Sequence, residues 1–240
     1  MGERICYYIE VSVTKNQHIQ LSAKRAVQDQ LGFWSVYFNR PRNFVFEAGD
    51  WIDIQFEDRV HKGGITYSIS SSPQEELIRI SFREGISEFK KALQSIQGGE
   101  QLYISQYGND YNFQLKRNQS SFLIAGGVGI APFRSMLLEM YENKDSNEVN
   151  LIYLHQTDQF LFKDELDLWA QKLPNFNISY IVTKEINRKK REKLILSLIK
   201  NVDQNFYISG PESMVESNEH LLIDNGVPIR NIRIDSFGGY

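Results

Sequence analysis

One segment combines a short strand pattern with many hydroxyl side chains: GGITYSISSSP, residues 63–73. Serine is a poor builder of buried strands, because its hydroxyl group needs a hydrogen-bond partner and adds little apolar area. We therefore expect a polar group to contact this strand. The alternative is a serine-rich edge strand that faces water.

A second candidate site is the glycine-rich turn in FLIAGGVGIAPFRSML, residues 122–137. The pattern predicts a buried strand, a turn at Gly126, Gly127 and Gly129, and a helix with Pro132 at its first position, where proline is favoured. Glycines let the backbone approach a ligand, and the N–H groups and dipole of a helix N-terminus suit pyrophosphate. The pattern favours a nucleotide site over a turn that serves packing alone.

Neither of two common nucleotide motifs fits this turn. A P-loop would close with Gly-Lys-Ser or Gly-Lys-Thr, and the turn contains no lysine. The dinucleotide fingerprint needs a third glycine, where this chain has Pro132, and a later acidic residue, whereas the next strand ends at YLHQT. The glycine turn by itself leaves the function open.

Composition excludes several classes of site and partner. The 240 residues include 27 Lys and Arg against 30 Asp and Glu, so the overall charge gives no reason to expect nucleic acid or an anionic membrane as partner. The single cysteine, Cys6, excludes internal disulfides and metal sites built from four cysteines of this chain, and we expect no metal. No segment resembles a signal peptide or a membrane span, so we expect no membrane insertion and a cytoplasmic location.

Two periodicities divide the chain near residues 114–121, and we expect domains at 1–117 and 118–240. Short alternating runs broken by glycine and proline predict an antiparallel β-barrel or sandwich in the first half, interrupted by a helix within 86–96. The second half alternates strands with helices, which predicts a doubly wound parallel α/β sheet. The expected strands are ICYYIEVSV, FWSVYF, WIDIQF, LIRISF and QLYISQY, then SFLIAG, VNLIYL, ISYIVT, NFYISG and NIRID, and the later helices are expected near 132–143, 162–172, 188–200 and 212–225.

In these motifs and their order the chain resembles the ferredoxin NADP reductase family of flavoproteins, in its bacterial form without a fused ferredoxin domain. TYSISSSP resembles the family's flavin-contacting Arg-x-Tyr-Ser strand, GISEFKKAL its Gly-x-x-Ser helix start, and GGVGIAPFRSM its nicotinamide nucleotide turn. FKDEL, YISGPESMV and DSFGGY follow in the family's order. The resemblance covers nearly the whole chain and implies an antiparallel barrel that binds FAD, followed by a parallel sheet that binds NADH or NADPH.

The resemblance also implies roles for single residues. Tyr67 would stack on or bond the flavin, and Ser68 would hydrogen-bond near the ring nitrogen that receives hydride. Ser209 stands where the family usually has a cysteine beside the hydride path, and Tyr240 or Phe237 would cover the flavin face. Ser68, Ser209 and Tyr240 are the catalytic candidates. The other implied cofactor contacts are Ile69, Ser70, Arg83, Gly85, Ile86, Ser87, Gly127, Gly129, Ile130, Pro132, Thr183, Gly210, Pro211 and Met214.

Some of these residues also have simpler interpretations. Ser87 and Ser209 are suited to cap helices, and Thr183 is suited to end a strand. The chain departs from the family at Ile65, where an arginine would neutralise the FAD pyrophosphate. That loss weakens FAD binding by about 1.5 to 3 kcal/mol if no cation replaces the arginine. Arg83 and Lys62 are the candidate replacements.

We therefore expect a flavin-dependent oxidoreductase that passes hydride from NAD(P)H to FAD and then electrons to a protein acceptor: ferredoxin, flavodoxin or an oxygenase component. HQTDQFLFK offers few cations for a 2′-phosphate, which slightly favours NADH. One alternative is a non-catalytic FAD-binding subunit of a larger redox complex, which Ile65 favours. Another is an NAD-dependent dehydrogenase without flavin, against which the missing ribose-binding acid argues.

Overall fold

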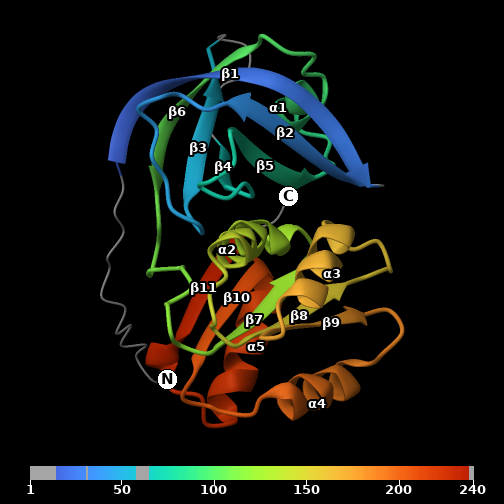
Figure 1. Cartoon of the computed structure of the whole chain (residues 1–240). Coiled ribbons are helices and arrows are strands. Elements are labelled where there is room, and N and C mark those ends of the chain that lie inside the picture. Colours follow the sequence, from blue (N-terminus) through green and yellow to red (C-terminus); the bar gives the residue numbers. More distant parts are fainter. Residues whose placement is uncertain (1–14, 31, 58–64, 238–240) are drawn as a thin grey trace, which may run out of the picture.

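The computed structural model describes residues 15–30, 32–57 and 65–237, which form two β-sheet layers stacked one above the other (Figure 1). The first sheet has six antiparallel strands in the order β4-β3-β6-β1-β2-β5. A bridge between Ile69 and Ile80 links the two edges of this sheet, so it curls into a barrel-like shape. Its elements are β1 (Lys15–Gln30), β2 (Phe33–Asn39), β3 (Trp51–Phe56), β4 (Ile65–Ser68), β5 (Leu77–Arg83), α1 (Glu88–Gln94) and β6 (Gln101–Gly108).

Strands of this sheet alternate between buried and less buried side chains. In β3 the side chains of Ile52, Ile54 and Phe56 are buried, and the residues between them are only partly buried. The antiparallel fold of the first half is confirmed. The expected strand ICYYIEVSV lies outside the described residues. Strand β1 was not predicted, although Ile19, Leu21 and Ala23 alternate with polar residues and are buried; the residues after Ala23 are mainly polar.

The second sheet has five parallel strands in the order β11-β10-β7-β8-β9, which confirms the doubly wound α/β prediction. Strand β7 is buried along its whole length. Helices cover both faces of the sheet, with α2 and α3 on the side of the first sheet and α4 and α5 on the other (Figure 1). The elements are β7 (Ser121–Gly126), η1 (Gly127–Gly129), α2 (Ile130–Asn143), β8 (Val149–His155), α3 (Lys163–Lys172), β9 (Phe176–Val182), α4 (Arg188–Leu198), β10 (Asn205–Pro211), α5 (Glu212–Asp224), η2 (Ile229–Asn231) and β11 (Ile232–Phe237).

The start of α2 differs from the prediction. Pro132 is the third residue of the helix and not the first, because the short 3-10 turn η1 leads directly into Ile130. The first N–H groups of a helix have no partner within the helix, so a proline at the third position breaks no hydrogen bond. The glycine segment is therefore a turn of 3-10 helix that continues into α2, and not an irregular loop.

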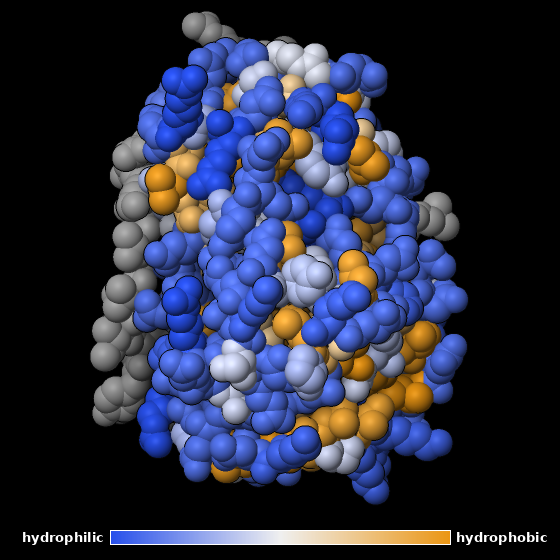
Figure 2. Space-filling view, viewed as in Figure 1, coloured by the Kyte–Doolittle hydropathy of each residue, from blue (hydrophilic) through white to orange (hydrophobic). Residues whose placement is uncertain are grey.

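The two sheets are joined by residues 109–120, and we propose the domain boundary at 117/118 within this connection. The face shown in Figure 2 is predominantly hydrophilic, with hydrophobic residues in smaller groups between. None of the helices in the described part of the chain has both the length and the apolar character needed to cross a membrane.

Candidate functional site

A cavity of about 490 Å³ lies where the two layers meet. Strands β3, β4 and β5 and helix α1 line it from the first sheet, and the η1–α2 turn and β11 line it from the second. A smaller cavity of about 170 Å³ shares Trp51, Ser68 and Asp235 with it. The candidate site is therefore built by both halves of the chain.

The carboxylate of Asp235 connects the two halves inside this site. Its Oδ2 accepts a hydrogen bond from Ser68 Oγ of the first sheet at 3.1 Å, and another from Ser209 Oγ of the second sheet at 3.1 Å. Ser209 lies directly beside Asp235, because β10 and β11 pair in parallel at these two residues. Burial raises the pKa of Asp235 above its usual 3.8, although both serine hydroxyls act in the opposite direction.

The sequence analysis predicted Ser68 and Ser209 as site residues, but it did not identify Asp235 or a contact between it and either serine. A signal was available, because Asp235 is the only carboxylate in the apolar strand NIRID. A carboxylate at the end of a buried parallel strand lies at the edge where such sheets bind their ligands. The structure brings together Ser68 and Ser209, the two catalytic candidates within the described residues, through a third group.

Tyr67 forms part of the cavity wall. Its side chain is buried and belongs to the core of the first sheet, with its ring centroid 5.8 Å from that of Phe82. Phe237, at the end of β11, lines the same cavity. The cavity therefore has aromatic walls next to the hydroxyl and carboxyl groups, a combination that suits a planar, mostly apolar ring with polar edges.

The two glycine turns of the second sheet pack against each other. A Cβ atom on Gly129 would lie 2.2 Å from the carbonyl oxygen of Ser209, and one on Gly210 would lie 2.3 Å from Met214 Cε. Tyr153 of β8 donates a hydrogen bond to the carbonyl oxygen of Gly127 at 2.8 Å, which holds the turn in place. Gly129 thus serves close backbone packing, which keeps Ser209 near the cavity.

We expect Gly129→Ala to lower the free energy of unfolding by about 2 to 3 kcal/mol, because its Cβ would meet backbone atoms that cannot swing away. Gly226→Ala is the matched control: its Cβ meets nothing within 4 Å, and only the positive φ of +89° opposes it. Thermal or denaturant unfolding compares the two variants. Equal losses would contradict the packing role of Gly129.

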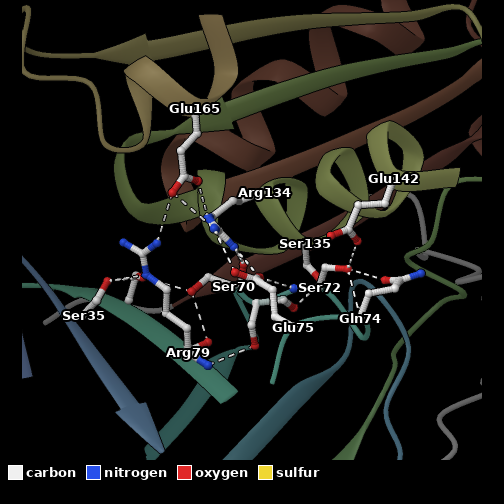
Figure 3. Close-up of polar contacts among 12 residues, drawn as sticks. Ser35, Ser70, Ser72, Gln74, Glu75, Arg79, Arg134, Ser135, Glu142 and Glu165 are labelled. Atoms are coloured by element: carbon white, nitrogen blue, oxygen red, sulfur yellow. Dashed lines mark hydrogen bonds and ion pairs between the residues drawn. The ribbon is translucent and has the colours of Figure 1, made fainter. Parts of the chain in front are cut away.

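The serines after β4 serve the junction between the layers (Figure 3). Ser70 Oγ donates to the carbonyl oxygen of Arg79, Ser71 Oγ accepts from the N–H of Arg79, and Ser72 Oγ donates to Glu142 of α2. Of the serines in residues 63–73, only Ser68 lines the cavity. These partners explain most of the hydroxyl groups without any ligand.

Arg134 of α2 holds the same junction together. Its guanidinium donates to the carbonyl oxygen of Ser70 at 2.7 Å and forms ion pairs with Glu75 at 2.8 Å and Glu165 at 2.6 Å (Figure 3). Glu165 also lies 3.6 Å from Arg79 of β5. Strand β5, helices α2 and α3 and the segment after β4 therefore share one network of charges.

The remaining predicted residues lie in several places. Arg83 lines the cavity, Ile86 is 91% exposed, and Ser87 caps α1 by accepting from the N–H of Lys90. Thr183 follows β9 and donates its N–H to the carbonyl oxygen of His155. Ile69, Ile130 and Pro132 are buried, Met214 packs on Gly126 and Gly210, and Pro211 is exposed beside them. Gly85 lies against Lys90. Tyr240 and Lys62 lie outside the described residues.

Several known proteins are similar to this chain in sequence. Residues 123–220 match the family described as the oxidoreductase NAD-binding domain. Flavohemoprotein A of Dictyostelium discoideum is 28% identical over 72% of this chain and 46% of its own length. The phenol hydroxylase P5 protein of Acinetobacter pittii is 26% identical over 82% of this chain and 59% of its own length. The chain thus spans about half the length of these relatives.

The likeness of fold extends over almost the whole chain. The crystal structure of a ferredoxin NADP+ reductase from Neisseria gonorrhoeae with bound FAD and NADP superposes with a TM-score of 0.75, at 18% identity, and covers 94% of this chain and 100% of that one. Both the curled antiparallel sheet and the parallel sheet are therefore matched. The chain has the two-domain fold of that ferredoxin NADP+ reductase, and its residues 123–220 match the oxidoreductase NAD-binding domain family.

Proposed function

We propose that the protein is an FAD-dependent NAD(P)H oxidoreductase that delivers electrons to a separate protein acceptor. The observation that carries the proposal is the carboxylate of Asp235, which joins Ser68 of one domain to Ser209 of the other at the cavity between them. Hydride transfer between two rings needs both rings held in contact and in a fixed orientation, which two domains that meet at one cavity can provide.

The residues of the first domain fit a flavin. The aromatic wall formed by Tyr67 suits the ring, Ser68 offers a hydroxyl at its polar edge, and Arg83 and Lys90 provide positive charge for phosphate groups. A bound FAD would supply the redox chemistry, since it accepts a hydride and releases electrons one at a time. We propose that Tyr67 and Ser68 orient the ring, and that Phe237 or Tyr240 shields its exposed face.

The second domain fits a nicotinamide nucleotide. The glycine turn at Gly127 and Gly129 and the turn at Gly210 and Pro211 lie together at the carboxyl ends of β7 and β10, where sheets of this kind bind nucleotides. Met214 supports both turns from α5. We propose that these residues, together with Thr183, position the nucleotide so that its ring reaches the cavity beside Ser209.

The acceptor is proposed from the relatives, whose names include a flavohemoprotein, a phenol hydroxylase protein and a ferredoxin NADP+ reductase. Because this chain has one cysteine, an iron–sulfur acceptor with four cysteine ligands would lie outside these 240 residues. We propose a small electron carrier such as ferredoxin or flavodoxin, or an oxygenase component. A cytoplasmic location follows from the proposed use of NADH or NADPH, which are intracellular metabolites.

The test is anaerobic addition of NADH or NADPH to the purified protein loaded with FAD. We expect the yellow flavin absorbance to bleach, and the ratio of the two rates gives the nucleotide preference. Flavin absorbance that persists with both nucleotides would contradict the reductase and favour the non-catalytic FAD-binding subunit. A protein that binds no flavin but oxidises or reduces NAD directly would favour the dehydrogenase.

A further inference from the structure

Three buried serines and one buried arginine form a closed cycle of hydrogen bonds beside the cavity. Arg79 Nε donates to Ser35 Oγ at 3.0 Å, and Ser35 Oγ lies 2.7 Å from Ser81 Oγ. Ser81 Oγ lies 3.0 Å from Ser70 Oγ. Ser70 Oγ donates to the carbonyl oxygen of Arg79 at 3.1 Å, which closes the cycle (Figure 3). The side chain and the backbone of one arginine are thus linked through three hydroxyl groups.

The number of donors fixes where each proton of this cycle lies. A serine hydroxyl has one proton and can accept two hydrogen bonds, whereas a backbone carbonyl can only accept. The proton of Ser70 points to the carbonyl oxygen of Arg79, so Ser81 must donate to Ser70. Because that uses the proton of Ser81, Ser35 must donate to Ser81. All three hydroxyl protons are therefore used within the cycle.

The direction of the cycle cannot reverse. A guanidinium group has donors and no acceptor, so Arg79 Nε can only donate to Ser35. The guanidinium is itself held in place, because its Nη2 donates to Asp29 at 2.7 Å and its Cζ lies 4.4 Å from the ring centroid of Phe162. The three serines therefore keep one fixed orientation of their hydroxyl groups.

Ser81 is the member of the cycle that lines the cavity. Its oxygen accepts from Ser35 and donates to Ser70, so one lone pair remains and no proton does. A group with an N–H at this position of the cavity gains a hydrogen bond, whereas a second acceptor would meet an unmatched lone pair. The cycle thus converts a serine, which can ordinarily donate or accept, into an acceptor toward the cavity.

The flavin ring of the proposed cofactor has one group that matches this acceptor. The oxidised ring carries a single N–H, at N3, and its other polar ring atoms are acceptors. We propose that Ser81 is a binding residue of the cavity, whose oxygen accepts a hydrogen bond from the N3–H of the flavin ring. This inference rests on the proposed FAD-dependent function, and it adds a residue that orients the ring and discriminates against rings without a donor there.

The experiment compares two flavins that differ by one donor: riboflavin and 3-methylriboflavin, in which a methyl group replaces the N3 proton. Fluorescence titration of the protein freed of FAD gives the Kd for each, and the ratio of the two constants is the readout. We expect wild-type protein to bind 3-methylriboflavin about 10-fold more weakly, the effect of one lost hydrogen bond. In Ser81→Ala and Ser81→Cys the ratio falls below about threefold, because alanine has no acceptor and the sulfur of cysteine is a weak one.

Ser35→Ala is the matched control. Ser35 is as buried as Ser81 and makes the same number of hydrogen bonds in the cycle, but it is not among the described residues that line the cavity. The two alanine variants should therefore lose similar stability. In Ser35→Ala the oxygen of Ser81 stays in place and still donates its proton to Ser70, so the ratio remains that of the wild type.

Three results would overturn this inference: a wild-type ratio near one, a ratio that Ser81→Ala and Ser81→Cys leave unchanged, or an equal fall of the ratio in Ser35→Ala. The last result would indicate that the cycle acts through packing alone. Should Ser81→Ala fail to fold, the wild-type ratio and Ser81→Cys, which keeps a side chain of similar size, decide the matter. A wild-type protein that binds neither FAD nor riboflavin would instead refute the proposed function itself.

Discussion

Asp235→Asn is expected to slow the bleaching of bound FAD by NADH or NADPH about 100-fold, with little change in FAD content. In the structure Asp235 Oδ2 accepts from both Ser68 and Ser209, so its charge holds the two hydroxyl groups in fixed orientations. A nicotinamide ring held beside Asp235 would gain positive charge as it gave up hydride, and the desolvated carboxylate of Asp235 would stabilise that charge. Removal of one such preorganised group commonly costs a factor of about 10² to 10³ in rate.

The dependence on pH distinguishes this role from a structural one. Because burial raises the pKa of Asp235 above 3.8, the carboxyl group takes up a proton at a higher pH than an exposed aspartate does. The wild-type rate of flavin bleaching is expected to fall as the pH is lowered through this raised pKa, since the neutral acid no longer accepts from both serines. The Asparagine variant has no such titration, so its rate loses that part of the pH profile.

Stability provides the control. A raised pKa means that the folded protein binds this proton more tightly than the unfolded chain does. The free energy of unfolding therefore falls as the pH rises from the pKa of Asp235 in the unfolded chain through its higher pKa in the folded protein. Asp235→Asn is therefore expected to keep or raise the melting temperature at neutral pH while the rate falls. Asp224→Asn, at the exposed end of α5, should change neither quantity. Equal rates for the two variants would contradict the role of Asp235.

Arg134→Met is expected to lower the free energy of unfolding by about 3 kcal/mol. The Arg134 side chain is 5% exposed and makes ion pairs with Glu75 and Glu165 as well as a hydrogen bond to the carbonyl oxygen of Ser70. Loss of one member of a buried ion pair costs about 3 to 5 kcal/mol, because its partners remain desolvated without a counter-charge. The lower end applies here, since both carboxylates are partly exposed.

Denaturant unfolding measures this loss, and Arg188→Met is its matched control. Arg188 also pairs with a glutamate at 2.6 Å, Glu192, but its side chain is 72% exposed. Exposed pairs of this kind contribute about 0.3 to 0.5 kcal/mol. The loss for Arg134→Lys should lie between the losses for Arg134→Met and Arg188→Met, because a lysine keeps the charge but cannot make the forked contacts of a guanidinium. A loss no larger than that of Arg188→Met would show that the network does not hold the two layers together.

The same network affects the proposed reaction. Arg134 and Ser135 bond the backbone of Ser70 and Ser71, which directly follow β4, the strand that carries Tyr67 and Ser68. The position of α2 relative to β4 sets how the two sides of the cavity meet. We therefore expect Arg134→Met to slow flavin bleaching as well.

The sequence by itself determined the two-sheet organisation. WIDIQF alternates because one face of its strand is buried, and SFLIAG is almost wholly apolar because both faces are buried. Both patterns can be read from neighbouring residues in the sequence. The glycine turn and the separate motifs of the two halves were likewise local patterns, whereas the start of α2 lies two residues earlier than its proline suggested. The long strand β1 was missed, because its alternation at Ile19, Leu21 and Ala23 is short and its later residues are mainly polar; pairing with β2 and β6 extends it.

Only the tertiary structure decided which groups meet at the site. Ser68, Ser209 and Asp235 belong to three strands, and the first is separated from the last by 167 positions. No periodicity encodes that contact, because it depends on how α2 packs against the segment after β4 and on the parallel register of β10 and β11. The same holds for Lys90, which the sequence analysis did not single out and whose side chain lies over the backbone of Gly85 at the cavity.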